Sequence, residues 1–172
     1  MNDYEMNPEQ ILIRKACRGD VKAFSELYAG IYQDLYRFAL FTLKHCEDAE
    51  DAVSDTVIAA YENIHKLKKE TSFRSWMFTI LVNQCKKRFR GEQWHADLTE
   101  ETAGEAVEGD YAEQHDVREA FMQLEEADRM IISCSVLEGY TSEEIGGLLG
   151  MNPATVRSRK ARALDQMRRI LE

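Results

Sequence analysis

Hydrophobic residues recur along the chain at intervals of three and four positions, and strict alternation of apolar and polar residues is nowhere sustained. This spacing places apolar side chains on one side of an α-helix, whereas a half-buried strand needs a period of two. It predicts a short helix near residues 8–18 and three longer ones before residue 90. Their stripes are Phe24, Leu27, Tyr28, Ile31, Leu35 and Phe38 on a helix starting at Asp20, then Ala49, Ala52, Val53, Thr56, Val57, Ala60, Tyr61 and Ile64, then Phe73, Trp76, Met77, Ile80, Leu81 and Cys85. We therefore predict an N-terminal helical bundle that ends at about residue 90.

The helical spacing returns after residue 116. One predicted helix carries Val117, Ala120, Phe121 and Leu124, the next carries Met130, Ile131, Cys134 and Leu137, and a last long helix turns Val156, Ala163, Met167 and Ile170 inward.

Start and stop signals define the last two helices of this group. Thr141-Ser-Glu-Glu144 is a capping box, and Gly150 suits the left-handed position that ends a helix. Asn152-Pro153 is a preferred cap residue followed by proline at the first helical position. Two helices joined by three residues with a glycine in the turn predict a helix-turn-helix, in which Gly146 lets the helices pack closely.

The residues between the two groups differ in composition. Residues 91–116 contain nine acidic side chains, no basic one, three glycines and only scattered apolar groups. Such a segment cannot bury enough surface to offset the entropy of ordering. The predicted fold is all-α, with two small helical domains at residues 8–90 and 117–172 joined by a flexible acidic linker at 91–116.

Composition narrows the class of protein. The 172 residues are 44% hydrophobic and 31% charged, which is typical of a soluble globular chain. The N-terminus lacks a basic start followed by an apolar run, and no window approaches the roughly 18 apolar residues of a membrane helix. We expect a cytoplasmic protein without membrane insertion. The four cysteines are far apart and no histidines cluster to complete a zinc site, so we predict buried or idle thiols and no metal site. We also expect no cofactor.

The charge distribution identifies a candidate nucleic-acid interface. The formal net charge is −9, yet residues 1–90 hold 14 basic and 13 acidic side chains, and residues 117–172 hold 8 and 9. On the last helix the face opposite Val156 carries Thr155, Arg157, Ser158, Ala161 and Arg162, with Arg159 and Lys160 at its flanks. Arginines near the start of such a helix can bind guanine edges, and small residues allow close approach. The alternative is an ordinary solvated helix face.

The N-terminal bundle has a cationic segment of its own. Lys66, Lys68, Lys69 and Arg74 lie in or beside a loop, and the next helix ends in Lys86-Lys87-Arg88-Phe89-Arg90. Cations with interleaved aromatics suit single-stranded or opened nucleic acid, although Phe73 and Trp76 lie on the apolar stripe and fit the core better.

Acidic residues begin the helix before this segment. Asp48, Glu50, Asp51 and Asp55 complement the helix dipole there, which is a sufficient structural role. Asp51, Ser54, Asp55 and Ile58 also form a mixed outward face that can receive a partner helix.

Four segments in this order resemble a known family. They are FSELYAGIYQDLYRFAL, DAEDAVSDTVIAAYENIHKLK, FRSWMFTILVNQCKKRFR and YTSEEIGGLLGMNPATVRSRKARAL. From about Pro8 to Leu171 the chain is similar to bacterial extracytoplasmic-function (ECF, group 4) sigma factors of the sigma-70 family. The resemblance implies a region 2 domain, a linker and a region 4 domain. It also implies a protein that performs no chemistry itself but brings RNA polymerase to promoters.

The resemblance implies roles for individual residues. The residues implied to bind duplex minus-thirty-five DNA are Thr155, Arg157, Ser158, Arg159 and Arg162. Those implied to bind opened minus-ten DNA are Lys68, Lys69, Asn83, Lys86, Lys87 and Arg90. Those implied to bind core polymerase are Asp48, Asp51, Ser54 and Asp55. Lys87 stands where the family usually has aspartate, and Lys160 stands at a frequently apolar position.

The implied partners are promoter DNA, an anti-sigma factor and core RNA polymerase, through the clamp helices of its largest subunit and the flap of its second-largest subunit. The linker carboxylates Glu100, Glu101, Glu105, Glu108 and Asp110 either stand in for RNA phosphates in the polymerase channel or only solubilise a spacer.

Two other classes of protein are weighed against this one. A stand-alone helix-turn-helix regulator with a sensing or dimerising N-terminal bundle would bind duplex DNA without polymerase. An enzyme has little support, because the neighbours His45 and Cys46 point about 100° apart on a helix.

Overall fold

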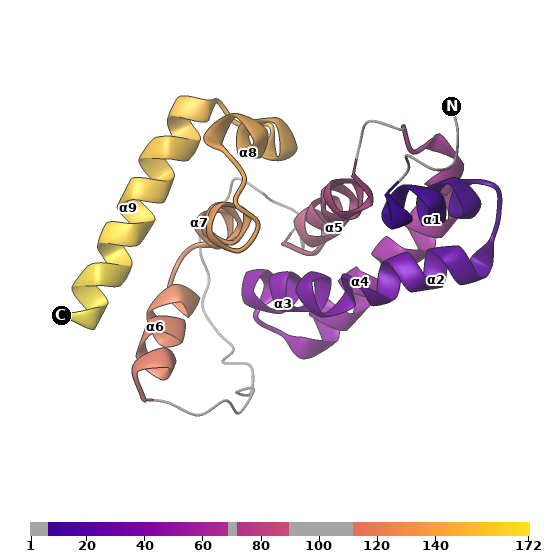
Figure 1. Ribbon diagram of the computed structural model, residues 1–172. Helices are drawn as coiled ribbons and strands as arrows, with labels where there is room; N and C mark the ends of the chain where they lie inside the picture. The colour runs from indigo at the N-terminus through magenta and orange to yellow at the C-terminus, as the bar shows by residue number, and fades with distance from the viewer. Residues whose placement is uncertain (1–6, 69–71, 90–111) are drawn as a thin grey trace.

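The computed structural model describes residues 7–68, 72–89 and 112–172, and all regular structure in these ranges is helical (Figure 1). The elements are α1 (Pro8–Cys17), α2 (Val21–Ala29), α3 (Tyr32–Leu43), α4 (Cys46–Asn63), the 3₁₀ turn η2 (Ile64–Lys66), α5 (Phe73–Phe89), α6 (Ala112–Met122), α7 (Glu126–Ile132), the π-helical turn η3 (Ser133–Leu137), α8 (Ser142–Leu149) and α9 (Pro153–Leu171). The predicted all-α fold is confirmed. No helix in the described ranges is both long and apolar enough to cross a membrane.

Helices α1–α5 form an N-terminal bundle around the predicted stripes. Leu35 and Phe38 of α3 are completely buried, as are Phe78 and Leu81 of α5. The rings of Phe38 and Phe78 meet edge to face with their centroids 5.6 Å apart. Burial of each such side chain contributes roughly 1.5–3 kcal/mol, so this aromatic centre holds α3 against α5.

The predicted helix from Asp20 through Phe38 is two helices in the structure. Helix α2 ends at Ala29, Gly30 follows as its cap, and Ile31 has φ −122° and ψ −4° before α3 begins. Glycine destabilises a helix interior by about 1 kcal/mol relative to alanine, which favours a break here. The apolar spacing continues across the break, so periodicity alone does not reveal it.

Helices α6–α9 form a C-terminal bundle. Helix α6 begins at Ala112, inside the segment 91–116 that was predicted as linker. Three positions on the predicted apolar stripes of this bundle are exposed, Val117 at 48%, Leu137 at 41% and Ile170 at 39%. Leu137 ends a turn and Ile170 lies in the last turn of α9, where few elements cover a side chain.

The helix-turn-helix of α8 and α9 matches its prediction closely. The Thr141 N–H donates to Glu144 Oε2 at 2.8 Å, and the Glu144 N–H donates back to Thr141 Oγ1 at 3.2 Å. Gly150 adopts the left-handed conformation with φ 67°. A Cβ added to Gly146 would lie 2.7 Å from the Met151 carbonyl oxygen, so the turn depends on a missing side chain at this position.

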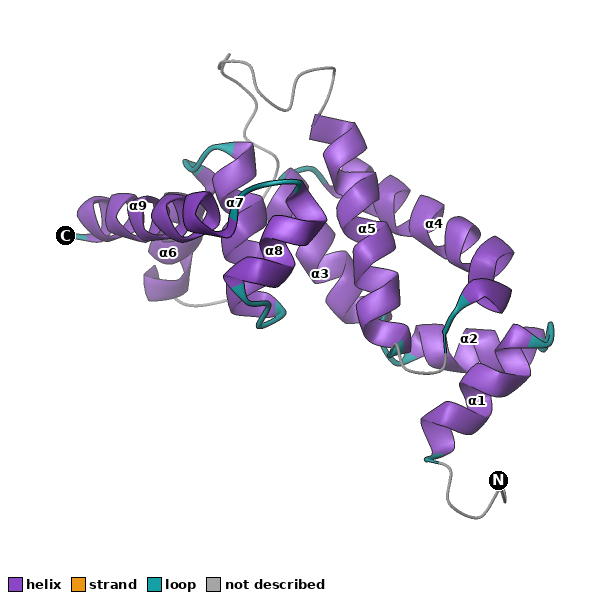
Figure 2. Ribbon diagram, turned by 90° about the horizontal axis from the view of Figure 1, so that it is seen from above, coloured by secondary structure: helices purple, strands orange, loops and turns teal. Residues whose placement is uncertain are grey.

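The two bundles also pack on each other. Helix α7 lies against α3 of the N-terminal bundle, and α8 lies against α5, as the two views show together (Figures 1 and 2). The turn η3 also contacts α3. Met130 and Cys134 belong to the same buried cluster as Phe38 and Phe78. The hydrophobic core is therefore continuous between the bundles.

Candidate nucleic-acid interface

Helix α9 has a buried inner face, and this determines which of its residues lie on the exposed outer face. Val156 and Ala163 are buried against the rest of the C-terminal bundle. The helical period then leaves Thr155, Arg157 and Ser158 exposed in the first turns after the cap residue Asn152. This exposed face holds four of the five residues predicted to bind duplex DNA: Thr155, Arg157, Ser158 and Arg162.

The cations of this face differ in what they contact. Arg157 Nη1 lies 2.9 Å from Glu143 Oε1, and both side chains are exposed, so water and salt weaken the pair. Within the described part of the chain, Lys160 and Arg162 have no carboxylate within ion-pair distance; Arg162 Nε donates to the Ser158 carbonyl at 3.4 Å. These three cations can approach phosphates or base edges without breaking a buried contact.

Arg159 is held differently. Its Nε donates to Asp128 Oδ1 at 2.7 Å and its Nη2 to Glu125 Oε2 at 3.0 Å, so it ties α9 to the start of α7. The side chain is half-buried, as is Asp128. A DNA contact by Arg159, which the resemblance implies, requires it to leave these carboxylates.

In the N-terminal bundle, α5 presents three of the residues assigned to opened DNA. Asn83 and Lys87 are exposed, whereas Lys86 is half-buried and its Nζ donates to the Leu148 carbonyl at 3.0 Å. Lys68 is exposed just after η2. Lys69 and Arg90 lie outside the described residues.

The aromatics of this segment belong to the core, as predicted. Phe73 is buried, and its ring centroid lies 6.2 Å from that of half-buried Trp76. These two rings pack against the core of the bundle and do not form a surface on which nucleic-acid bases could stack. Any binding of α5 to a polyanion therefore depends on its cations.

The acidic face of α4 is exposed as expected. Asp48, Asp51 and Ser54 lie on the outside of α4. Asp55 is also exposed, and its Oδ2 lies 2.7 Å from Arg88 Nη2 on α5. Sequence patterns do not predict this pair, because its partners are 33 positions apart and on different helices. The linker carboxylates Glu100, Glu101, Glu105, Glu108 and Asp110 lie outside the described residues.

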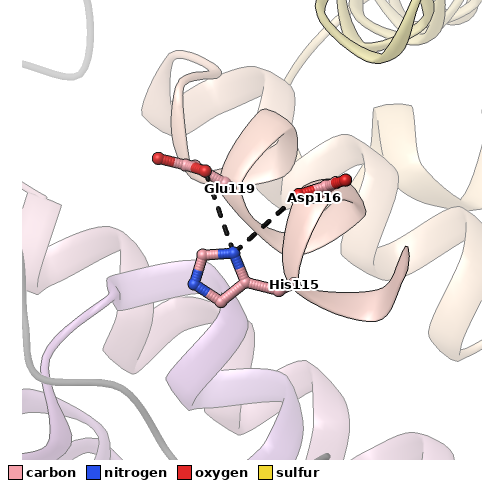
Figure 3. Close-up of side chains that lie close together, drawn as sticks. All are labelled: His115, Asp116 and Glu119. Atoms are coloured by element: carbon pink, nitrogen blue, oxygen red, sulfur yellow. Dashed lines mark ion pairs between the residues drawn. The ribbon is translucent and has the colours of Figure 1, made fainter. Parts of the chain in front are cut away.

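One cluster with metal-ligand chemistry lies on α6 (Figure 3). His115 Nδ1 is 4.0 Å from Asp116 Oδ1 and 3.9 Å from Glu119 Oε2, and all three side chains are exposed. They are neighbours within one turn of the same helix, which is the arrangement of a surface ion pair formed when the histidine is protonated. We interpret the cluster as local support of α6.

The two buried cysteines, Cys85 and Cys134, are poor nucleophiles in this structure. Burial raises the pKa of Cys85 and raises that of Cys134 to about 12, so both thiols stay uncharged at neutral pH. Cys46 is exposed and Cys17 is partly buried. The described residues present three surfaces suited to binding: the cationic face of α9, a cationic helix in the other bundle and the acidic face of α4.

Comparison with known proteins gives two family matches. Residues 27–95 match the model of sigma-70 region 2, and residues 114–167 match a model of sigma-70 region 4. The chain is 30% identical over 138 residues to the RNA polymerase sigma factor SigV of Bacillus subtilis, covering 79% of this chain and 83% of SigV. It is 29% identical over 157 residues to the ECF RNA polymerase sigma factor SigM of Mycobacterium tuberculosis, covering 89% of this chain and 79% of SigM.

Two solved structures share the fold. CnrH in complex with the cytosolic domain of CnrY has a TM-score of 0.67 at 24% identity, covering 96% of this chain and 97% of that chain. The sigma factor RpoE in complex with the anti-sigma factor NepR, from Bartonella quintana, has a TM-score of 0.69 at 24% identity, covering 88% of this chain and 98% of that chain.

Proposed function

The chain belongs to the extracytoplasmic-function group of sigma-70 family RNA polymerase sigma factors, and from this premise we propose how its parts divide promoter-specific initiation. Residues 8–90 act as the region 2 domain, residues 91–116 as the linker and residues 117–172 as the region 4 domain. The positions of the two family matches support this division.

The region 4 domain reads the minus-thirty-five element as duplex. Helix α9 enters the major groove with its exposed face, where Arg157 and Arg162 are placed for base edges or phosphates and Thr155 and Ser158 allow close approach. Arg159 contributes by holding α9 on α7, and it binds DNA only if it exchanges its carboxylate partners for phosphate. Phosphate contacts supply affinity and register, and base-edge contacts supply sequence choice.

The region 2 domain captures the opened minus-ten element. Asn83 lies on the exposed side of α5 with Lys86 and Lys87 within one turn, so an amide for a base edge is next to cations for phosphates. Lys68, Lys69 and Arg90 extend this cationic segment. Extruding a base costs a few kcal/mol of unstacking, which contacts in the protein must recover.

The acidic face of α4 docks on core polymerase. Asp48, Asp51, Ser54 and Asp55 present carboxylates and a hydroxyl to the clamp helices of the largest subunit, and the region 4 domain binds the flap of the second-largest subunit. Because structures of the same fold contain CnrY and the anti-sigma factor NepR, we expect an anti-sigma partner for this chain too. Initiation places the protein in the cytoplasm, and it binds without catalysis or cofactor.

The observation that carries this proposal is the exposed cationic face of α9 on a well-capped helix-turn-helix. The test begins by mapping transcript starts after overexpression, which supplies the promoter. Purified protein with core polymerase should then start transcripts at that promoter, and core alone should not. Tight binding to a duplex operator without any initiation would instead establish a stand-alone regulator.

A further inference from the structure

An acidic side chain lies against the cationic face of α9. Glu143, the second residue of α8, comes from the other helix of the helix-turn-helix and accepts a hydrogen bond from Arg157 Nη1 at 2.9 Å. Both side chains are exposed, Arg157 at 57% and Glu143 at 67%. Binding to a polyanion depends on cations, so a carboxylate at this place opposes it. The presence of Glu143 beside this face therefore needs a reason of its own.

Support of α8 does not account for the contact. Glu144, the next residue, already completes the capping box with Thr141, and it also places a negative charge in the first turn of the helix. Negative charge there is stabilised by the helix dipole, and Glu143 shares in this effect. The dipole, however, acts on a carboxylate whether or not the carboxylate touches α9. The hydrogen bond to Arg157 is the feature that belongs to Glu143 alone.

Arg157 keeps most of its donors free. A guanidinium has five N–H donors in a planar fork. Among the described residues, the hydrogen bond from Nη1 to Glu143 is the one that Arg157 makes. A bidentate contact to O6 and N7 of guanine takes two donors. Arg157 can therefore bind a guanine edge while its bond to Glu143 persists.

A phosphate group makes a different demand on the same arginine. It is an anion, so it competes with Glu143 for the guanidinium and brings a second negative charge close to the carboxylate. Like charges that meet across an interface repel, whereas O6 and N7 of guanine are uncharged acceptors. Bound DNA also excludes water from this face, which reduces screening of the repulsion. Glu143 therefore favours a base edge over a phosphate as the partner of Arg157.

The other cations of this face have no such neighbour. In the described part of the chain, Lys160 and Arg162 have no carboxylate within ion-pair distance. Nothing in their surroundings opposes a phosphate. The face thus combines cations suited to the DNA backbone with one arginine whose environment disfavours it.

We infer that Glu143 is a positioning residue that directs Arg157 to a guanine of the minus-thirty-five element and away from phosphates. The inference rests on the proposed function, and it adds how sequence choice arises at α9. Glu143 acts through Arg157 and does not itself contact a base. It follows that the element contains a guanine at the position that Arg157 reaches.

The test uses Glu143→Gln, which keeps the size of the side chain and removes its charge. Holoenzyme is assayed for affinity on the mapped promoter and on variants in which each minus-thirty-five base pair is replaced in turn. For the wild type, replacement of one guanine should cost affinity, and Arg157→Ala should abolish that preference. In Glu143→Gln the preference for this guanine should fall by at least about threefold.

The salt dependence of affinity provides a second readout that a purely structural role would not change. If Arg157 turns to a phosphate in Glu143→Gln, the slope of log affinity against log salt concentration should steepen by about 0.9, the value for one added phosphate contact. In the Arg157→Ala background, Glu143→Gln should change neither the slope nor the base preference, because Glu143 acts through Arg157.

The matched control is Glu172→Gln. It neutralises another exposed glutamate that pairs with an exposed arginine, Arg168, at the far end of α9. This variant should keep the base preference and the salt slope of the wild type.

Three results would overturn the inference. The first is a wild-type base preference and salt slope in Glu143→Gln, even with a lower urea midpoint, because Glu143 would then only stabilise α8. The second is an equal loss of preference when Arg157 is already alanine. The third is an Arg157→Ala loss that is the same for every promoter sequence.

Failure of the proposed function is recognised separately. If the wild type with core polymerase does not initiate, that function is wrong, and the same variants are then measured as full-length chains on a duplex selected from a random pool. Loss of the guanine preference in Glu143→Gln on that duplex would still support the positioning role. A wild type that prefers no duplex sequence would overturn it.

Discussion

The arginines of α9 differ in whether they can leave their protein partners. Arg157 pairs with Glu143 on the exposed surface, whereas Arg159 is half-buried between α7 and α9 with two carboxylates. An exposed pair contributes about 0–1 kcal/mol, so DNA can replace Glu143 at little cost. The sequence predicted the exposed face from the helical period, but it could not distinguish these two arginines. Their partners lie 14 to 34 positions away on other helices.

Arg157→Ala should weaken initiation from a promoter with an intact minus-thirty-five element by about 1–3 kcal/mol if Arg157 binds a base edge bidentately. The measurement compares transcript yield in vitro on that promoter and on one whose minus-thirty-five element is scrambled. The loss should appear on the intact promoter alone.

Arg168→Ala is the matched control for Arg157→Ala. It removes an arginine from the same helix, also exposed and also paired with a glutamate, but near the end of α9 that is remote from the turn. Equal losses for Arg157→Ala on every promoter sequence would show that this residue binds phosphate instead.

At the scale of elements, the local signals in the sequence were reliable where they concerned helix ends. The capping box at Thr141, the left-handed Gly150 and the start at Asn152-Pro153 all form as predicted, because each depends on residues within four positions. The break at Gly30 and the early start of α6 were missed. The apolar spacing continues through the break at Gly30, and the acidic composition of residues 91–116 obscured the start of α6.

Gly146→Ala should destabilise the helix-turn-helix, because its new Cβ would meet the backbone carbonyl of Met151 at 2.7 Å. Overpacking of this kind costs about 1–3 kcal/mol, measured as a lower urea midpoint of unfolding. DNA binding should weaken with it, since α9 would be displaced.

Gly147→Ala provides a sharp control one position along the same helix. A Cβ there has no neighbour within 4 Å, so the higher helix propensity of alanine should stabilise the protein by about 0.5–1 kcal/mol. If the two substitutions shifted the midpoint alike, close packing at Gly146 would not be the reason for its glycine.

At the scale of the whole molecule, the acidic face of α4 should determine capture of core polymerase. Asp51→Arg with Asp55→Arg reverses two exposed charges on this face, and Asp55→Arg also breaks the pair with Arg88. We expect about tenfold weaker binding to core, or about 1.4 kcal/mol, in a quantitative pull-down. Helix content should be retained, because both side chains point outward.

Glu62→Arg is the control for this double variant, since it reverses an exposed charge near the other end of α4. It should bind core polymerase like the wild type. Unchanged affinity in the double variant would remove this face from the docking surface.

The packing of the two bundles on each other could not have been predicted from the sequence. Each bundle has its own periodic stripes, which specify which helix faces are buried but not which bundle covers them. The contacts that join the bundles, such as Arg129 with Thr42 and Arg74 with Glu138, link positions 87 and 64 residues apart and leave no local pattern.

Because these contact partners are far apart in sequence, the ribosome makes one partner of each contact well before the other. Helices α1–α5 are complete when the ribosome has yet to make α7 and α8, and domains generally fold as units in the order of synthesis. A nascent N-terminal bundle therefore exposes the Thr42 carbonyl and the Lys86 ammonium before Arg129 and Leu148 exist. Until α7 and α8 are made, the N-terminal bundle, which we propose captures the opened minus-ten element, is therefore present without the helices that later pack against α3 and α5.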